Sequence, residues 1–303
     1  MKELFKNKTI LITGGGTIGS ELLNQLLIYD IEQVRIIDNN ELILHNLKQK
    51  YKNNNKIRYL FGDIRDIDRL NIAMRGVDFV FHTAAMKHVS FCEENPIDAI
   101  YTNVLGTENV INAAIREECS KFINISTDKA INPVNVMGAT KLLTERLVAV
   151  ANNLKGRTNT IFTSVRFGNV LASSGSVIPI FENQIKNNLP LTVTDKDATR
   201  FMMRIEDAVN LILNTISISK GNEIFILKMP TIKIIDIAKQ MNKQYGRDEN
   251  NIVFTGLIKG EKLHEELITK EESQLAMQND KMLVIPPEVL ISYYESIGFR
   301  RLI

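Results

Sequence analysis

This sequence has few cysteines, no tryptophan and almost no surplus of either charge. Its 303 residues include two cysteines and no tryptophan, and 37 basic side chains face 35 acidic ones, a formal net charge of +2. Cys92 and Cys119 form neither a CxxC pair nor a metal-ligand spacing, so we expect no disulfide framework, no metal site and a reducing compartment. The balanced charge argues against nucleic acid or a membrane as partner.

Long apolar runs are missing as well. No stretch approaches the roughly 18 apolar residues of a membrane span. The N-terminal MKELFKNKTILITGG passes from a basic stretch into a strand-like run too soon for a signal peptide. We therefore expect a cytoplasmic protein, and its length suggests two domains at roughly 150 residues each.

Short apolar runs alternate along the chain with segments of helical spacing. Helical patterns cover residues 20–28, 96–117 and 135–153. The predicted strands are residues 9–13, 33–37, 57–61, 78–82, 121–126 and 160–165. Parallel neighbours need a crossover element, so this alternation predicts the α/β class with a doubly wound parallel Rossmann sheet. Its ligand should lie at the carboxyl ends of the strands.

The first predicted strand runs into a glycine-rich turn. In Thr13-Gly-Gly-Gly-Thr-Ile-Gly, the first, third and sixth positions of a GxGxxG pattern are Gly14, Gly16 and Gly19, with Thr17 and Ile18 between the last two. Such glycines let the backbone approach a pyrophosphate at a helix N-terminus. We therefore expect these five residues to bind a dinucleotide.

An acidic residue ends the second predicted strand. Asp38 can accept hydrogen bonds from an adenosine ribose, and its charge would repel a 2′-phosphate. Asn39 and Asn40 follow it and no arginine does, which favours NAD over NADP. Two further strand ends should line the cofactor, at Asp63 with Ile64 and at Ala84 with Ala85.

The pattern loosens after about residue 166 into stretches rich in Gly, Ser, Pro and Asn. We assign residues 1–166 to an NAD-binding Rossmann domain and residues 167–303 to a smaller, interleaved α/β substrate lobe. Within the second part, a helical run at 206–218 and a strand at 223–228 are expected to pack on the first domain. About residues 205–228 would then belong to the Rossmann domain.

Two motifs follow the fifth predicted strand, STDKA at residues 126–130 and MGATK at 137–141. With them, the chain resembles the extended short-chain dehydrogenases/reductases, specifically the nucleotide-sugar 4,6-dehydratases of the polysaccharide-biosynthesis type. The resemblance spans nearly the whole chain and includes TGGGTIGSEL, FHTAAMKHVSFCEENP, TNVLGT, VRFGNVLASSGSVIP, TRFMM and GEKLHEEL. It implies that Lys141 holds the nicotinamide ribose and that Asn103, within TNVLGT, belongs to the cofactor site.

Three positions depart from that family. The glycine loop is one residue shorter than the usual TGxxGxxG. Met137 stands where the wider family has the Tyr of its YxxxK pair, which places the chain in a Met-containing, soluble branch. The family's RPGEK is Ile258-Lys259-Gly260-Glu261-Lys262 here, so one expected phosphate-contacting arginine is absent. Whether Lys259, one place along, replaces it is left open.

The catalytic residues we expect are Thr127, Asp128, Lys129, Met137 and Lys141. Oxidation of sugar carbon 4 acidifies the proton on carbon 5, and loss of the carbon 6 hydroxyl then needs a base and an acid. We assign the base to Lys129, with its pKa lowered by the nicotinamide and Lys141, and the acid to Asp128, kept protonated by burial. Thr127 replaces the missing tyrosine hydroxyl beside carbon 4.

A nucleotide-diphosphate substrate needs cations and polar donors in the looser lobe. Lys87, near the cofactor loop, is either a further substrate contact or a surface lysine. By resemblance, the substrate is UDP-N-acetylglucosamine and the product a UDP-4-keto-6-deoxy-N-acetylhexosamine. We also expect a homo-oligomer, and the number of subunits is left open. The other expected substrate-binding residues are Arg166, Asn169, Ser174, Val177, Arg200, Glu261 and Lys262.

Two other functions fit the same motifs. A UDP-sugar 4-epimerase would use the cofactor and fold but needs no acid–base pair for carbons 5 and 6, so the adjacent Asp128 and Lys129 favour dehydration. A catalytically silent NAD-binding regulatory protein is suggested by Met137 and Ile258, whereas the intact Thr127 and Lys141 argue against it. The sequence favours retention at carbon 5 and leaves inversion open.

Overall fold

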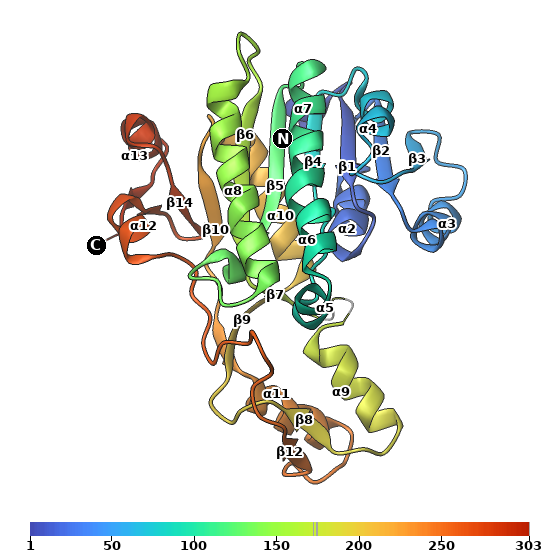
Figure 1. Ribbon diagram of the computed structural model, residues 1–303, viewed down its shortest axis with the longest axis vertical. Helices are drawn as coiled ribbons and strands as arrows, with labels where there is room; N and C mark the ends of the chain where they lie inside the picture. Colours follow the sequence, from blue (N-terminus) through green and yellow to red (C-terminus); the bar gives the residue numbers. More distant parts are fainter. Residues whose placement is uncertain (172, 174, 303) are drawn as a thin grey trace.

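The computed structural model describes residues 1–171, 173 and 175–302. Within them, a ten-stranded sheet runs in the order β15-β13-β14-β10-β6-β5-β4-β1-β2-β3 (Figure 1). The first six strands pair in parallel, which confirms the predicted doubly wound sheet. They are β1 (Thr9–Thr13), β2 (Gln33–Asp38), β3 (Ile57–Phe61), β4 (Phe79–His82), β5 (Lys121–Thr127) and β6 (Ile161–Phe167).

Helices cover both faces of the sheet, and each face has its own apolar core. On one face lie α2 (Thr17–Leu26), α3 (Glu41–Lys50) and α10 (Ile205–Ile218), and α10 packs against α2. On the other lie α4 (Ile67–Met74), α7 (Gly106–Arg116) and α8 (Val136–Leu154). α8 begins where the Asn135 side chain accepts a hydrogen bond from the Gly138 N–H, and it buries Thr144, Val148 and Ala151 at helical spacing.

The strand order reverses beside β1, which lies between β2 and β4. The connections leave this point in opposite directions, so a crevice opens at the carboxyl ends of β1 and β4. The glycine turn after β1 and the Ala84–Ala85 segment after β4 both lie at this edge.

A smaller lobe hangs below the sheet in Figure 1. It contains the three-stranded sheet β11-β9-β7 and the pair β12-β8. Phe181, Leu191 and Met202 belong to its separate core. Its elements are β7 (Asn169–Val170), α9 (Val177–Lys186), β8 (Leu191–Val193), β9 (Thr199–Met203), β11 (Thr231–Lys233), α11 (Ile234–Gln244) and β12 (Ile252–Phe254).

The chain returns to the large sheet more than once. α10 and β10 (Ile224–Leu227) lie in the large lobe, with β10 parallel to β6. Three C-terminal strands also extend the large sheet, namely β13 (Met277–Gln278), β14 (Met282–Ile285) and β15 (Arg300–Arg301). The sequence had assigned these residues to the substrate lobe. The three strands join the sheet antiparallel through short connections, so no crossover helix signalled the return.

Short elements complete the fold. η1 is a π-helical turn whose buried Asn103 faces the loop after β4. The C-terminal elements pack beside β14 at the sheet edge opposite β3 (Figure 1). The short helical elements of the whole chain are α1 (Lys2–Phe5), α5 (Val89–Glu94), α6 (Pro96–Ala99), η1 (Ile100–Leu105), η2 (Asp128–Ala130), α12 (Lys270–Leu275), η3 (Glu288–Leu290) and α13 (Ile291–Ser296).

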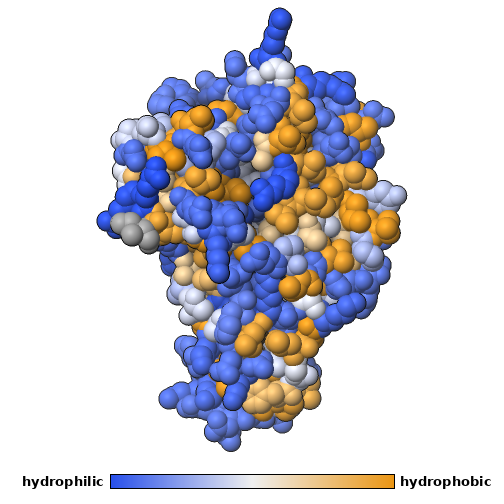
Figure 2. Space-filling model, turned by 60° about the vertical axis from the view of Figure 1, so that its left-hand side comes forward, coloured by the Kyte–Doolittle hydropathy of each residue, from blue (hydrophilic) through white to orange (hydrophobic). Residues whose placement is uncertain are grey.

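Hydrophobic side chains gather on the surface of the larger lobe (Figure 2). η1 packs against α8, and both present exposed apolar residues. Tyr101 is 50% exposed and Leu105 40% on η1, and Leu143 is 50% exposed and Val150 41% on α8. We call these four residues the η1–α8 face. Among the described helices, none has the length and apolar character needed to cross a membrane.

Candidate active site

The glycine turn after β1 brings the backbone close to the first turn of α2. Gly14 has φ of +86°, in the left-handed region that favours glycine. A Cβ on Gly19 would lie 1.9 Å from the Gly14 carbonyl oxygen, so only glycine fits there. Gly16 stands at the N-cap of α2 and has no side chain to satisfy the first N–H groups. Together with Thr17 and Ile18 in the first turn, this geometry suits a pyrophosphate.

Asp38 ends β2 and braces the same turn. Its Oδ2 accepts a hydrogen bond from the Gly15 N–H at 2.6 Å, and its Oδ1 accepts one from Asn40 N–H at 2.7 Å. Each carboxylate oxygen has a second lone pair that can accept a ribose hydroxyl. The structure therefore places Asp38 beside the glycine turn, where the sequence expected an adenosine contact.

The other expected cofactor residues lie along the same edge. Ala84 approaches the turn so closely that a Cβ on Gly14 would lie 2.8 Å from its nitrogen, and Ala85 follows it. Asp63, at the end of β3, forms a 2.7 Å ion pair with Arg65, and that partner lowers the pKa of the carboxyl against the opposing effect of burial. Ile64 is buried against α7.

Asn103 holds the loop after β4, and its place in the cofactor site, implied by resemblance, remains a prediction. Its Oδ1 accepts from the Met86 N–H, and its Nδ2 donates to the Met86 carbonyl at 3.0 Å and to Thr140 Oγ1 at 2.9 Å. Both amide hydrogens are therefore used within the protein. Asn103 ties the loop after β4 to α8, so it positions the crevice wall.

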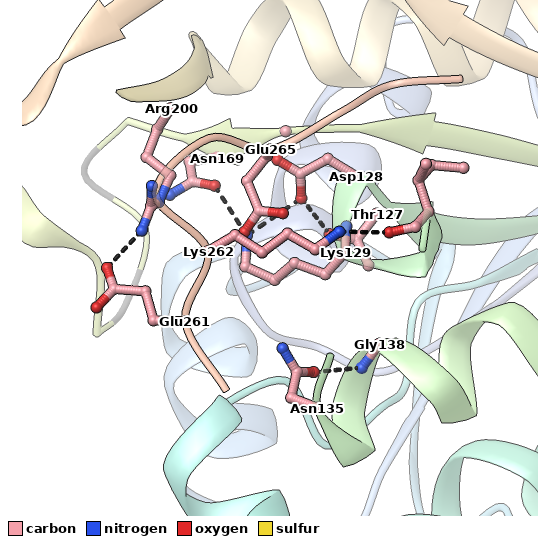
Figure 3. A network of polar contacts seen from close by, with 12 residues as sticks. Thr127, Asp128, Lys129, Asn135, Gly138, Asn169, Arg200, Glu261, Lys262 and Glu265 are labelled. Carbon is pink, nitrogen blue, oxygen red and sulfur yellow. Dashed lines mark hydrogen bonds and ion pairs between the residues drawn. The ribbon is translucent and has the colours of Figure 1, made fainter. Parts of the chain in front are cut away.

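The acid–base residues cluster where β5 meets the smaller lobe (Figure 3). Asp128 is fully buried and its Oδ1 lies 3.1 Å from Lys129 Nζ. The Thr127 hydroxyl donates to the same oxygen at 2.9 Å. From the smaller lobe, Asn169 Oδ1 lies 3.4 Å from Lys129 Nζ. The structure thus brings Thr127, Asp128, Lys129 and Asn169 together.

Glu265 joins this cluster and was not predicted. It lies between β12 and α12, and its Oε1 is 3.4 Å from Lys129 Nζ. The side chain is 3% exposed. The one weak signal for it is the pair of adjacent glutamates in GEKLHEEL, and nothing local indicates which of the two turns inward.

The pKa of Lys129 differs from the sequence expectation. Burial alone would lower it, but the nearby carboxylates of Asp128 and Glu265 outweigh burial and raise the pKa. Lys141 does not enter this balance; its ammonium instead donates to the Ile125 carbonyl at 2.5 Å. Lys129 is therefore held as an ammonium, and the expectation of a pKa lowered toward neutrality is wrong for this structure.

Lys141 is buried on α8, four residues after Met137. Burial lowers the pKa of Lys141 to about 8, although Glu145 opposes the shift. Burial and the charge of Lys141 lower the pKa of His82 to about 3, so His82 is neutral between Thr13 and Thr107. Met137 is 4% exposed and packs in a small apolar cluster with Cys92 and Ala99, where its side chain anchors α8.

Arg166 does not reach the substrate side. It is fully buried and binds both carboxylate oxygens of Glu145, at 3.0 and 2.7 Å, and both of Glu272, at 2.9 and 3.0 Å. It also donates to the Leu267 carbonyl. The expected phosphate contact is wrong, because this guanidinium is used to join β6, α8 and α12. Glu145 and Glu272 were not predicted as its partners.

Arg200 and Glu261 bind each other. Arg200 donates to the Glu261 carboxylate and to the carbonyls of Thr199 and Leu263. Lys262 Nζ donates to the Ile131 carbonyl at 2.6 Å, beside the acid–base cluster (Figure 3). The phosphate and ribose contacts expected of these side chains remain predictions.

Three expected substrate residues lie in loops or at a helix start. Lys87 is exposed in the loop after β4. Val177 is the first residue of α9. Ser174 lies outside the described residues. Among the described residues, no group of three or more His, Cys, Asp or Glu side chains could hold a metal ion.

A Rossmann sheet with a nucleotide turn, a buried acid–base cluster and a small second lobe defines a dinucleotide-dependent enzyme class. The family model described as "Polysaccharide biosynthesis protein" matches residues 10–287. The chain belongs to this family of nucleotide-sugar dehydratases and epimerases.

Relatives in this family have different activities. A UDP-N-acetylglucosamine 4,6-dehydratase (inverting) of Campylobacter jejuni is 40% identical over 97% of this chain and 87% of its own length. A UDP-glucose 4-epimerase of Rickettsia bellii is 42% identical over 89% of this chain and 80% of its own. The chain is therefore an enzyme of the nucleotide-sugar class, with two candidate reactions.

Solved structures share the fold. The X-ray structure of Pen from Bacillus thuringiensis has a TM-score of 0.91 and 47% identity over 94% of this chain and 91% of that one. The dTDP-glucose 4,6-dehydratase DesIV of Streptomyces venezuelae, solved with NAD bound, has a TM-score of 0.79 and 21% identity over 87% of this chain and 89% of that one. At that identity, the likeness to DesIV concerns the fold alone.

Proposed function

We propose that this protein is an NAD-dependent 4,6-dehydratase that converts UDP-N-acetylglucosamine to a UDP-4-keto-6-deoxy-N-acetylhexosamine for surface glycans. The observation that carries the proposal is the pair of buried Asp128 and half-buried Lys129. The Thr127 hydroxyl donates to Asp128, and the pair faces the second lobe. Removal of water across carbons 5 and 6 needs a proton donor and a proton acceptor close together. Epimerisation at carbon 4 does not need this pair.

The residues at the strand ends fit NAD. Gly14 and Gly19 let the turn pack closely on its own backbone, and Gly16 leaves open space at the start of α2, where a pyrophosphate would bind. Asp38 would meet the adenosine ribose. Buried Lys141 would hold the nicotinamide ribose. When bound there, NAD would supply the reversible hydride transfer between sugar carbons 4 and 6.

The protein's own groups handle the protons. Thr127, with no tyrosine at position 137, is the hydroxyl placed to hydrogen-bond the carbon 4 oxygen, and its contact with Asp128 Oδ1 provides a route for that proton. Asp128 donates to the departing carbon 6 oxygen. Lys129 stays charged between two carboxylates and stabilises the negative charge that develops when carbon 5 loses its proton.

The product distinguishes the two candidate reactions. Incubated with UDP-N-acetylglucosamine, the enzyme is expected to yield a compound lighter by one water, detected by mass spectrometry. An isomer of unchanged mass would instead support the epimerase, which the Rickettsia relatives favour. NMR of the product then gives the configuration at carbon 5. We propose retention, although the Campylobacter relative is named an inverting enzyme.

Cofactor choice should depend on Asp38. Asp38→Ala is expected to narrow the preference for NAD over NADP, because repulsion of the 2′-phosphate is lost while no new contact forms. Titration of both cofactors, followed by fluorescence, measures the ratio of dissociation constants. Asp30→Ala, at an exposed position, is the control. Comparable wild-type affinity for NADP would contradict the assignment.

The η1–α8 face supports self-association. An apolar face on two packed helices can pair with its own copy, because a two-fold interface needs only self-complementarity. We propose a homodimer through Tyr101, Leu105, Leu143 and Val150. Leu143→Glu is expected to give a monomer in light scattering after gel filtration, whereas Leu189→Glu, on the smaller lobe and 51% exposed, should leave the wild-type mass unchanged. A dimer that persists in Leu143→Glu would contradict this face.

A further inference from the structure

Glu265 places a second buried carboxylate against Lys129. The Glu265 and Asp128 side chains are 3% and 0% exposed, at 3.4 and 3.1 Å from the same Nζ. One oxygen of each carboxylate points toward Lys129 (Figure 3). The other oxygens, Glu265 Oε2 and Asp128 Oδ2, are buried and have no hydrogen-bond partner among the described residues. A buried carboxylate oxygen without a partner is costly, so both atoms point to a ligand that donates or gives up a proton.

The neighbouring cations do not satisfy Glu265. Arg200 directs its hydrogen bonds to Glu261, Thr199 and Leu263, and the Lys262 ammonium donates to the Ile131 carbonyl. Asn169 turns its carbonyl oxygen, an acceptor, toward Lys129. Two carboxylates therefore share the single ammonium of Lys129.

We propose that Glu265 is a catalytic residue, the base that removes the carbon 5 proton through Oε2. This inference rests on the proposed dehydratase function and deepens it. Both carboxylates contact the same Nζ, so the proposed acid and the proposed base lie beside one ammonium. Lys129, a poor base while it holds its proton, lies between them and supplies positive charge.

The protons and electrons balance in this scheme. The carbon 5–hydrogen bond breaks, and the proton goes to Glu265 Oε2. The electron pair forms the carbon 5–carbon 6 double bond beside the carbon 4 ketone. The carbon 6–oxygen bond breaks, and the oxygen leaves as water with a proton from Asp128. Asp128 has this proton because it received it from the carbon 4 hydroxyl through Thr127 when carbon 4 was oxidised. When hydride returns to carbon 6, Glu265 returns its proton to carbon 5, so both carboxylates end in the protonation state in which they began.

The test replaces Glu265 with glutamine, which keeps the size and removes the proton acceptor. With bound NAD and UDP-N-acetylglucosamine, Glu265→Gln is expected to lose dehydration by about 10²–10⁴-fold, the usual contribution of a positioned base. Oxidation at carbon 4 should survive and appear as reduced-cofactor absorbance on mixing. Glu265→Asp should retain more of the rate than Glu265→Gln, because it keeps a carboxylate.

The neighbouring Glu266→Gln is the matched control. Glu266 is exposed, binds the Asn132 side chain at 2.8 Å, and should tolerate the change with wild-type dehydration. Dehydration by Glu265→Gln within about threefold of wild type would overturn the inference. Equal loss of dehydration and of the absorbance signal would overturn it too, because the defect would then precede carbon 5. Failure of the wild type and Glu266→Gln to release water would refute the proposed dehydratase itself.

Discussion

Lys129→Ala is expected to lose dehydration by about 10²–10³-fold, as when a preorganised group that stabilises transition-state charge is removed. The physical reason is the ammonium held between Asp128 and Glu265, whose charges raise the Lys129 pKa despite burial. Product formation from UDP-N-acetylglucosamine, followed by mass spectrometry, measures the loss. Lys243→Ala is the control, because Lys243 lies on α11, is 76% exposed and pairs at 3.5 Å with Glu249.

Lys129→Arg separates the two possible roles of this residue. Arginine keeps the positive charge and does not lose its proton in proteins. If Lys129 acts through its charge, Lys129→Arg should retain more activity than Lys129→Ala. If Lys129 is itself the base, as the sequence alone suggested, both variants should be equally inactive, and the assignment to Glu265 would be contradicted.

Isotope labels follow the reaction within one sugar. In deuterated water, the wild type is expected to place one deuteron at carbon 5, because the proton removed there exchanges before it returns. Deuterium initially on carbon 4 should reappear in the new methyl group at carbon 6. A methyl group without that label would contradict internal transfer and with it the proposed dehydration.

Arg166→Met is expected to lower the free energy of unfolding by about 3–5 kcal/mol, because it leaves the buried Glu145 without its partner. Arg166 is 0% exposed, and the Glu145 and Glu272 side chains are 2% and 16% exposed. In thermal denaturation this corresponds to a fall in Tm on the order of 10 °C. Adding Glu145→Gln should recover part of the loss, because the uncompensated charge is removed.

The control for Arg166 is a surface ion pair. Arg204 is 71% exposed and pairs with Asp207 at 3.0 Å, so Arg204→Met should leave the Tm close to that of the wild type. UDP affinity, measured by calorimetry on folded Arg166→Met, should equal that of the wild type. If Arg166→Met kept the wild-type Tm and bound UDP more weakly, the result would support the phosphate contact that the sequence suggested for Arg166.

The sequence by itself determined the first half of the fold and the cofactor edge. Strand and helix periodicity, the GxGxxG turn and the position of Asp38 depend on residues close together in the chain, and parallel topology brings the strand ends to one edge. The adjacency of Thr127, Asp128 and Lys129 is likewise local. These features could be predicted because short-range spacing specifies them.

Only the tertiary structure decided which distant side chains meet. Arg166 resembles a phosphate ligand in a strand-end motif, yet packing of α8 and α12 surrounds it with Glu145 and Glu272. Glu265 reaches Lys129 because an irregular segment crosses from the smaller lobe, and no periodicity marks which glutamate faces inward. The C-terminal strands extend the sheet by antiparallel pairing at its edge. Charge, burial and pKa depend on these long-range contacts, which local spacing does not encode.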